Sequence, residues 1–399
     1  MPANPQIPTG VTFAWRLAGF YAALCMALGV QMPFLPVWFA AKGMDASSVG
    51  IVLAIPLLVR LIATPIASDL ADRHDALRAV IITGAIGSLL AYCGVGLMNA
   101  TTAIMAAVAL ASAFYTPLMT LADAYALHGL PLHGRGYGPV RLWGSAAFIV
   151  GTIGGGLLLD VFAPPDLIWL VVAALGLNAA AAGMLSPLHD ERSEPKSERA
   201  RATLLLRNRW FLAIAVAAAL IQASHAVYYG FSALQWQAAG RSGATIGILW
   251  AIGVIAEIAL FAASARHHFD PVILLGAGAG GAVIRWGAMA FDPPLPVLAV
   301  LQCLHAFSFG ATHLGAVAFV ARAAPAGLGA SAQGYLAVAL ALAMALAMAI
   351  SGELYADVGS GAYGAMALLA ALGGLCLLAG RSPSSDIPDG QRPRSRRAM

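Results

Sequence analysis

The sequence predicts an all-α membrane protein with twelve transmembrane helices, arranged as two six-helix halves. Two observations support this fold class. Charged residues make up only 10% of the 399 residues and the mean hydropathy is +0.81, whereas a soluble domain carries about 25% charged residues. The chain also contains twelve apolar stretches, each near the length that a helix needs to cross roughly 30 Å of hydrocarbon. Most of the surface is therefore expected to face lipid.

The twelve stretches form two groups of six. They cover residues 13–40, 47–69, 77–97, 101–124, 137–160, 167–186, 210–236, 245–266, 271–291, 296–321, 329–355 and 361–380. The charged segment 187–209 is typical of a solvated linker, and it separates an N-terminal half, 1–186, from a C-terminal half, 210–380. The basic tail 381–399 is rich in Pro, Ser and Arg, a composition that predicts disorder.

The basic residues of the loops indicate the orientation in the membrane. On one side the loops contain only Lys42 and Arg241, while most other bases, among them Arg73, Arg78 and Arg135, fall on the opposite side with the linker and the tail. Cytoplasmic loops carry an excess of Lys and Arg. The pattern predicts that both termini are cytoplasmic. It also accounts for the net charge of +4, so no nucleic-acid partner is expected.

The second apolar stretch of each half, with the loop before it, follows one pattern. The N-terminal copy reads WFAAKGMDASSVGIVLAIPLLVRLIA and the C-terminal copy reads WQAAGRSGATIGILWAIGVIAEIAL. Allowing one gap, the matched pairs are Trp38 with Trp236, Gly50 with Gly247, Ile55 with Ile252, and Arg60 with Glu257. The repeat predicts two halves in the same orientation, related by an axis along the membrane normal.

The loop after the second stretch carries a degenerate signature. It reads SDLADRHDALR and resembles the G-x-L-A-D-R-x-G-R-R signature of the major facilitator superfamily, with Ser68 in place of the first glycine and only Arg78 left of the final Gly-Arg-Arg. The resemblance implies that Asp72 and Arg73 form a cytoplasmic gate. A basic loop with a helix N-cap is the alternative interpretation.

Further patches resemble the phenylpropionate permease group of this superfamily. They are YGPVRLWGSAAFIVG from Tyr137, SHAVYYGFSALQWQAAG from Ser224, AEIALF from Ala256, VIRWGAM from Val283 and LQCLHAFSFGATHLGA from Leu301. The resemblance implies proton-coupled symport of a small aromatic carboxylate, such as a phenylpropionate-like acid, across a bacterial inner membrane. It implies a monomeric protein that is not an enzyme and needs no cofactor beyond the proton gradient. Related groups carry sugars or nucleosides, which leaves the substrate open.

Ionisable residues inside the apolar stretches are functional candidates, because a charge at the bilayer centre costs at least about 2.5–3.5 kcal/mol. Asp123 shares a helix face with Ser112, Thr116 and Met119, as the period of 3.6 residues requires. This polar stripe predicts proton coupling or gating by Asp123. A structural cap is the alternative, since Asp123 lies near the cytoplasmic end of its stretch.

The seventh stretch carries an aromatic face made of His225, Tyr228, Tyr229, Ser232 and Trp236. Aromatic rings stack on an aromatic substrate and tyrosine hydroxyls can bond its polar end. We therefore predict that the histidine and both tyrosines bind substrate. Simple packing is the alternative.

Two arginines are candidates for binding a carboxylate through the planar fork of the guanidinium group. Arg60 lies deep in the second stretch without an acidic neighbour, and Arg141 starts a stripe with Ser145 and Phe148 in the fifth. The sequence slightly favours Arg60. Neutralisation of either arginine by an acidic side chain is the alternative.

Glu257 has two interpretations. A membrane-embedded carboxyl can carry a proton. The loop after the eighth stretch also brings Arg285 to about the same depth, so a structural Glu257–Arg285 pair is equally compatible. His305 and His313, eight residues apart in the tenth stretch, are further candidates for proton coupling, or are satisfied core histidines. The four cysteines have no metal-ligand spacing, and neither a metal site nor catalytic residues are predicted.

Taken together, these residues predict a proton symporter that works by alternating access, with Arg60 or Arg141 holding the substrate carboxylate. Two alternatives stay open. One is export of hydrophobic drugs by proton antiport, which would have little need for Arg60. The other is a membrane sensor that transports nothing.

Overall fold

The computed structural model describes residues 10–188, 203–264, 266–267, 269–324 and 328–379. Every regular element in these ranges is a helix, which confirms the predicted fold class. The central part of the predicted linker, 189–202, and the whole predicted tail lie outside the described residues.

The N-terminal half contains seven α-helices within the described residues, two of which form one membrane span. They are α1 (Gly10–Ala41), α2 (Ala46–Arg73), α3 (Leu77–Leu97), α4 (Thr101–Tyr115), α5 (Leu118–Leu132), α6 (Tyr137–Leu159) and α7 (Leu167–Gly183). The sequence treats 101–124 as one helix, but Pro117 divides it into α4 and α5 because proline has no backbone N–H to donate. Helix α5 then continues to Leu132, eight residues beyond the predicted end.

The C-terminal half is interrupted more often. Its described helices are α9 (Arg209–Ala223), α10 (Ala226–Ala238), α11 (Gly243–Ser264), α12 (Pro271–Met289), α13 (Leu295–Cys303), the π-helix η3 (Ala306–Ala311), α14 (Thr312–Ala323), α15 (Gly329–Val358) and α16 (Ala362–Ala379). The predicted seventh stretch breaks at Ser224 and His225. There the Ser224 hydroxyl donates to the Ile221 carbonyl, and a side-chain bond of this kind competes with the helical ladder.

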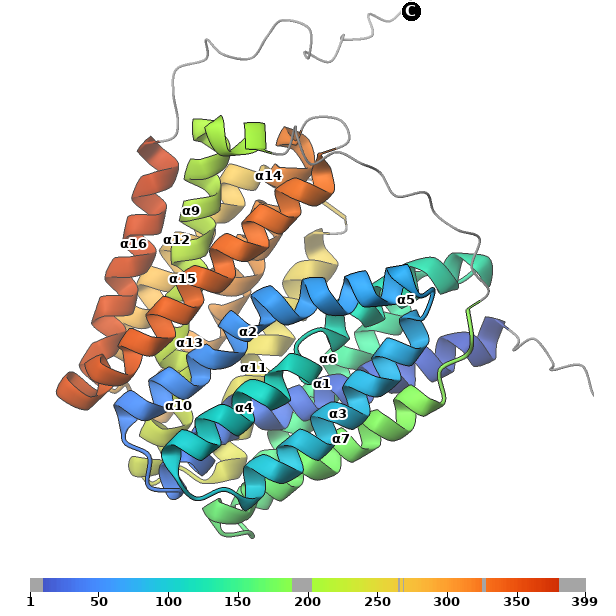
Figure 1. Ribbon diagram of the computed structural model, residues 1–399. Helices are drawn as coiled ribbons and strands as arrows, with labels where there is room; N and C mark the ends of the chain where they lie inside the picture. Colours follow the sequence, from blue (N-terminus) through green and yellow to red (C-terminus); the bar gives the residue numbers. More distant parts are fainter. Residues whose placement is uncertain (1–9, 189–202, 265, 268, 325–327, 380–399) are drawn as a thin grey trace, which may run out of the picture.

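Eleven helical stretches among the described residues are long and apolar enough to cross a membrane. The last, Gly329–Ala379, has 51 residues, far more than the ~20 that one crossing needs. It consists of α15 and α16, which lie antiparallel in Figure 1 and turn at Gly359, whose φ is 55°. A positive φ suits a residue without a Cβ. The described residues therefore contain twelve helical segments of the length and composition of the twelve predicted crossings.

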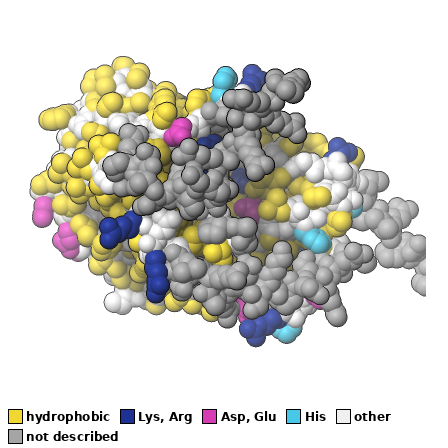
Figure 2. All heavy atoms as spheres, turned by 90° about the horizontal axis from the view of Figure 1, so that it is seen from above, with side chains coloured by type: hydrophobic (Ala, Val, Ile, Leu, Met, Phe, Trp, Pro, Cys, Tyr) yellow, Lys and Arg dark blue, Asp and Glu magenta, His cyan; other side chains and the backbone are white. Residues whose placement is uncertain are grey.

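The two halves form two helix bundles that meet at one end (Figure 1). Helices α2 and α15 converge at the start of α2 and the end of α15, and diverge in the other direction. We call the end formed by loops 42–45, 98–100, 160–166, 239–242, 290–294 and 359–361 the closed end, and the opposite end the open end. The face that is turned upward in Figure 1 includes the open end of the C-terminal half. Lys and Arg side chains are spread over this face (Figure 2).

Glycines of the sequence repeat form the contact between the halves at the closed end. A Cβ at Gly50 would lie 2.8 Å from the Met348 carbonyl oxygen, and one at Gly247 would lie 2.3 Å from that of Thr152. Both distances are too short for any side chain. The matched glycines therefore play the same structural role. Gly50 allows the backbones of α2 and α15 to touch, and Gly247 allows those of α11 and α6 to touch.

Candidate functional site

A cavity of about 220 Å³ lies between the two bundles. The N-terminal half lines it with Cys25, Leu28 and Met32 of α1, Met119 of α5, and Arg141, Gly144, Ser145 and Phe148 of α6. The C-terminal half contributes Tyr228 and Tyr229 of α10, Trp250, Val254 and Glu257 of α11, His305 at the start of the π-helix, and Phe309 within it. The cavity is thus largely apolar and aromatic with a few polar groups, as is typical of small-molecule sites.

Arg141 is the cation of the N-terminal wall. Its spacing from Ser145 and Phe148 puts all three on one face of α6, and all three line the cavity. The Arg141 guanidinium lies 5.3 Å from the centre of the Tyr21 ring, and Nη1 lies 3.8 Å from Cys25 Sγ. Among the described residues it has no hydrogen bond or ion pair with a carboxylate, so most of its five donors are available to a ligand.

Asp123 lies behind this wall and not in the cavity lining. Its Oδ1 accepts hydrogen bonds from the Tyr21 hydroxyl at 2.6 Å and the Tyr137 hydroxyl at 2.9 Å. The neighbouring polar stripe is also satisfied within its own helix, because the Ser112 hydroxyl donates to the Val108 carbonyl. Helix periodicity could not indicate the two tyrosines, since they lie on α1 and α6.

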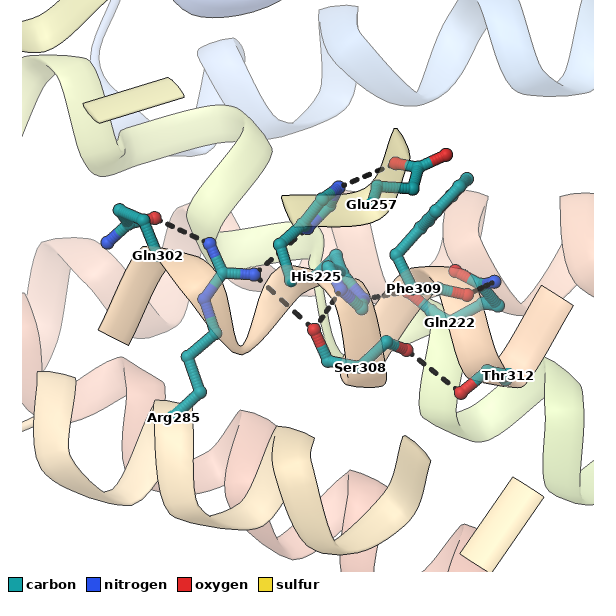
Figure 3. Close-up of polar contacts among 9 residues, drawn as sticks. Gln222, His225, Glu257, Arg285, Gln302, Ser308, Phe309 and Thr312 are labelled. Carbon is teal, nitrogen blue, oxygen red and sulfur yellow. Dashed lines mark hydrogen bonds and ion pairs between the residues drawn. The ribbon is translucent and has the colours of Figure 1, made fainter. Parts of the chain in front are cut away.

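The C-terminal wall contains a chain of three ionisable residues, Arg285, His305 and Glu257, of which Arg285 and Glu257 are labelled in Figure 3. Arg285 is fully buried, and its Nη1 donates to His305 Nδ1 at 3.0 Å. Because arginine can only donate, Nδ1 must be an acceptor, and the proton of the neutral imidazole is then on Nε2. His305 Nε2 lies 3.5 Å from Glu257 Oε2. The described residues therefore form no direct Glu257–Arg285 pair, and His305 stands between the two charges.

The π-helix Ala306–Ala311 supports this chain. Its Ser308 hydroxyl oxygen lies 3.4 Å from Arg285 Nη1, and its Phe309 carbonyl accepts from Gln222 Nε2 at 3.3 Å (Figure 3). An extra residue in a helical turn changes which side chains share a face, and such turns are frequent at functional sites. Hydrophobic periodicity gives no sign of it.

The predicted aromatic face of the seventh stretch divides between two environments. Tyr228 and Tyr229 line the cavity, and Tyr228 stacks on Trp250 at 4.7 Å. His225 is fully buried outside the lining, with Nδ1 3.0 Å from the Gln222 carbonyl and Nε2 3.1 Å from the Ser308 hydroxyl. Trp250 was not singled out by the sequence, because a tryptophan in an apolar run is indistinguishable from a core residue.

The remaining predicted residues lie outside the lining. His313 is exposed and stacks on Phe309 at 6.1 Å. Arg60 is exposed on α2. At the open end Asp72 is exposed, and Arg73 Nε pairs with Asp69 of its own helix at 2.8 Å. Of the residues predicted from the sequence, the fold places five in the lining of this cavity: Arg141, Tyr228, Tyr229, Glu257 and His305. It places Arg60, Asp123, His225 and His313 outside the lining.

Comparisons with known proteins agree with this architecture. The MFS_1 like family matches residues 14–363. The chain is 32% identical over 369 residues to a probable 3-phenylpropionic acid transporter of Escherichia coli (strain K12), covering 89% of this chain and 94% of that protein. It is 25% identical over 331 residues to the maltose permease of Geobacillus stearothermophilus, covering 79% and 82% respectively.

A solved structure shares the fold. The crystal structure of the nucleoside transporter NupG (D323A mutant) superposes with a TM-score of 0.82 at 14% sequence identity, covering 93% of this chain and all of that one. At this identity the likeness concerns the fold alone. With the twelve crossings and the central cavity, these findings identify the chain as a member of the MFS_1 like family of the major facilitator superfamily, a secondary membrane transporter and not an enzyme.

Proposed function

We propose that the protein is a proton-coupled symporter that takes up a small aromatic carboxylate, such as a phenylpropionate-like acid. The observation that carries the proposal is the composition of the cavity. It combines Arg141, which has no carboxylate partner among the described residues, with a wall of aromatic rings and with the carboxylate of Glu257. The 32% identity to a probable 3-phenylpropionic acid transporter supports the same substrate class.

Arg141 is the residue that we assign to the substrate carboxylate. A guanidinium group offers two parallel N–H donors to a carboxylate, and the water-poor setting of a cavity strengthens the interaction. The aromatic end of the substrate then packs against Tyr228, Tyr229 and Trp250, whose rings prefer offset or edge-to-face stacking. Arg60, which is exposed on α2 outside the lining, has no part in this assignment.

Charge balance is the reason for proton coupling. Among the described cavity-lining residues, the Arg141 guanidinium is positive and the deprotonated Glu257 carboxylate offsets it, while His305 is neutral because its Nδ1 accepts from Arg285. A substrate carboxylate adds a second negative charge, which a low-dielectric site disfavours. Balance is restored when a proton enters with the substrate, and Glu257 can accept it. The Nε2–H tautomer of His305 then keeps a donor directed at Glu257.

The other candidates keep supporting roles in this proposal. Asp123 holds Tyr21 and Tyr137 next to Arg141, and His225 holds the π-helix through Ser308. Asp72 and Arg73 remain the proposed gate of the open end. His313 is assigned to the proton path between Glu257 and that end.

Orientation follows from the same proposal. The open end has the loops with most of the basic residues, so we assign it to the cytoplasm of a bacterial inner membrane, with both termini inside. The described cavity is then the inward-facing state of a monomer.

The proposal is tested by comparing Arg141→Ala with Arg60→Ala in proteoliposomes. Uptake of radiolabelled 3-phenylpropionate is driven by an inside-alkaline pH gradient, with maltose and a nucleoside as alternative substrates. Loss of a charge-assisted bidentate contact worth roughly 3 kcal/mol should weaken uptake by about a hundredfold in Arg141→Ala. Arg60→Ala should keep near-normal uptake. Normal uptake by Arg141→Ala would overturn the assignment, and uptake of maltose or nucleoside alone would overturn the substrate class.

A further inference from the structure

The carboxylate of Asp160, in the N-terminal half, accepts hydrogen bonds from the C-terminal half at the closed end. Asp160 follows the last residue of α6 in the N-terminal half. Its Oδ1 accepts a hydrogen bond from the Gly243 amide at 2.6 Å, and its Oδ2 accepts one from the Ala244 amide at 3.0 Å. These amides begin α11, which belongs to the C-terminal half. Asp160 therefore supplies the acceptors that a helix N-terminus lacks.

The N-terminus of α11 lacks a capping carboxylate of its own, whereas the corresponding N-terminus of α2 has one. In the repeat, Asp45 before α2 corresponds to Ser242 before α11. Asp45 caps its own helix by accepting from the Ser48 amide at 2.7 Å, and this hydrogen bond holds the pKa of the Asp45 carboxyl below its usual value. Ser242 makes the equivalent cap, accepting from the Thr245 amide at 3.2 Å and contacting the Thr245 hydroxyl at 2.9 Å, but its hydroxyl group carries no charge. An anion at the start of α11, where the helix dipole is positive, comes from the other half.

The backbone around Asp160 leaves no room between the two halves. A Cβ at Gly243 would lie 2.3 Å from the Gly156 carbonyl oxygen, and one at Gly156 would lie 2.1 Å from the Gly243 carbonyl oxygen. The ends of α6 and α11 are thus in direct backbone contact. Asp160 can make its two hydrogen bonds only while this contact is closed.

A second carboxylate, in the C-terminal half, makes the corresponding hydrogen bond to the N-terminal half. Glu353 of α15 accepts a hydrogen bond from the Ser47 hydroxyl near the start of α2. The neighbouring Gly352 allows the same backbone contact, because a Cβ there would lie 2.4 Å from the Ala46 carbonyl oxygen. Each half therefore sends one carboxylate to the start of the second helix of the other half. The two contacts differ in strength, since Asp160 binds two amides and Glu353 one hydroxyl.

We propose that Asp160 is the principal latch of the closed end, with Glu353 as the weaker second latch. For this end to open in the transport cycle, the Asp160 carboxylate must leave the amides of Gly243 and Ala244. The ionised carboxylate thereby sets the fraction of protein molecules that are closed at this end in the absence of substrate. The proposal requires a transporter that alternates between two open states, and it does not depend on which substrate is carried.

The test measures the width of the closed end directly, without substrate. Spin labels are attached to Ala100→Cys in the N-terminal half and Phe291→Cys in the C-terminal half, both exposed positions at this end. The four native cysteines are replaced. Double electron–electron resonance then gives the distance distribution for the parent protein and for Asp160→Ala, Asp160→Asn and Glu353→Ala. The control is Asp357→Ala, which removes an exposed carboxylate at the same end.

We expect Asp160→Ala to raise the ratio of long to short distances by about fivefold, the usual effect of removing a helix N-cap. Asp160→Asn should fall between it and the parent, Glu353→Ala should have a smaller effect, and Asp357→Ala should have none. A parent-like distribution for Asp160→Ala would overturn the proposal. If that variant does not reach the membrane, a parent-like distribution for Asp160→Asn overturns it instead. Failure of phenylpropionate uptake leaves this measurement unaffected, so the two proposals are tested separately.

Discussion

Arg285 is a fully buried cation whose hydrogen-bond partners among the described residues are all neutral. Its guanidinium group donates to Gln302 Oε1 at 2.6 Å and to His305, and it lies 4.4 Å from the centre of the Tyr228 ring. A buried charge is tolerated only when other groups compensate it. Here the compensation comes from the face of the Tyr228 ring and from the dipoles of Gln302, His305 and Ser308. Glu257 is not paired directly with Arg285 and lines the cavity.

Replacement of Glu257 by Gln separates binding from coupling. A glutamine resembles the protonated carboxyl, so the variant should still bind substrate and exchange it across the membrane. It should lose proton-driven accumulation, which for one coupled proton amounts to about tenfold per unit of pH gradient. Exchange and accumulation of labelled substrate are measured in the same proteoliposomes. Accumulation that survives in Glu257→Gln would exclude this residue as the proton carrier.

The sequence identified single residues better than it identified their partners. Arg141, Tyr228, Tyr229 and Glu257 could be found because polar or aromatic groups at helical spacing are unusual in a membrane span. The sequence slightly favoured Arg60 over Arg141 because Arg60 lies deeper in its span, whereas Arg141 is the arginine that lines the cavity. Depth in the membrane does not reveal which face of a helix meets the cavity. The His305 bridge depends on three separate helices, so only the tertiary structure could reveal it.

At the scale of elements, the most extensive contacts between the halves are made by two helix pairs, α2 with α15 and α6 with α11. Both pairs depend on glycines at matched positions of the repeat, Gly50 and Gly247. The repeat and the approximate positions of the spans could be predicted because they follow hydrophobicity, although α5 extends eight residues beyond its predicted end. The breaks between α9 and α10 and at the π-helix could not, because they arise from side-chain hydrogen bonds to the backbone and leave the apolar pattern intact.

Gly247→Ala should destabilise the conformation in which the closed end is closed. The new Cβ would meet the Thr152 carbonyl oxygen at 2.3 Å, and overpacking of this kind costs about 1–3 kcal/mol. We expect a shift toward the long spin-label distances and slower uptake. Gly154→Ala on α6 is the matched control, because a Cβ there meets nothing within 4 Å. Equal distance distributions for the two variants would contradict the proposed role of the repeat glycines.

At the scale of the whole molecule, the two halves enclose one cavity and touch at one end. Twelve crossings and two similar halves could be predicted from the sequence, because composition and a repeat suffice for that. The conformation could not, because the same helices and the same apolar faces serve both end states. What distinguishes the states is a small set of contacts between the halves, such as those of Asp160 and Glu353 at the closed end.

The central claim is that a proton enters the cavity with each substrate carboxylate. It is tested most directly by adding 3-phenylpropionate to lightly buffered proteoliposomes and recording the external pH together with the uptake of labelled substrate. The account predicts that the external medium becomes more alkaline as substrate enters, with about one proton taken up per molecule, and that Arg141→Ala removes both signals. Substrate entry without any change in external pH would contradict it.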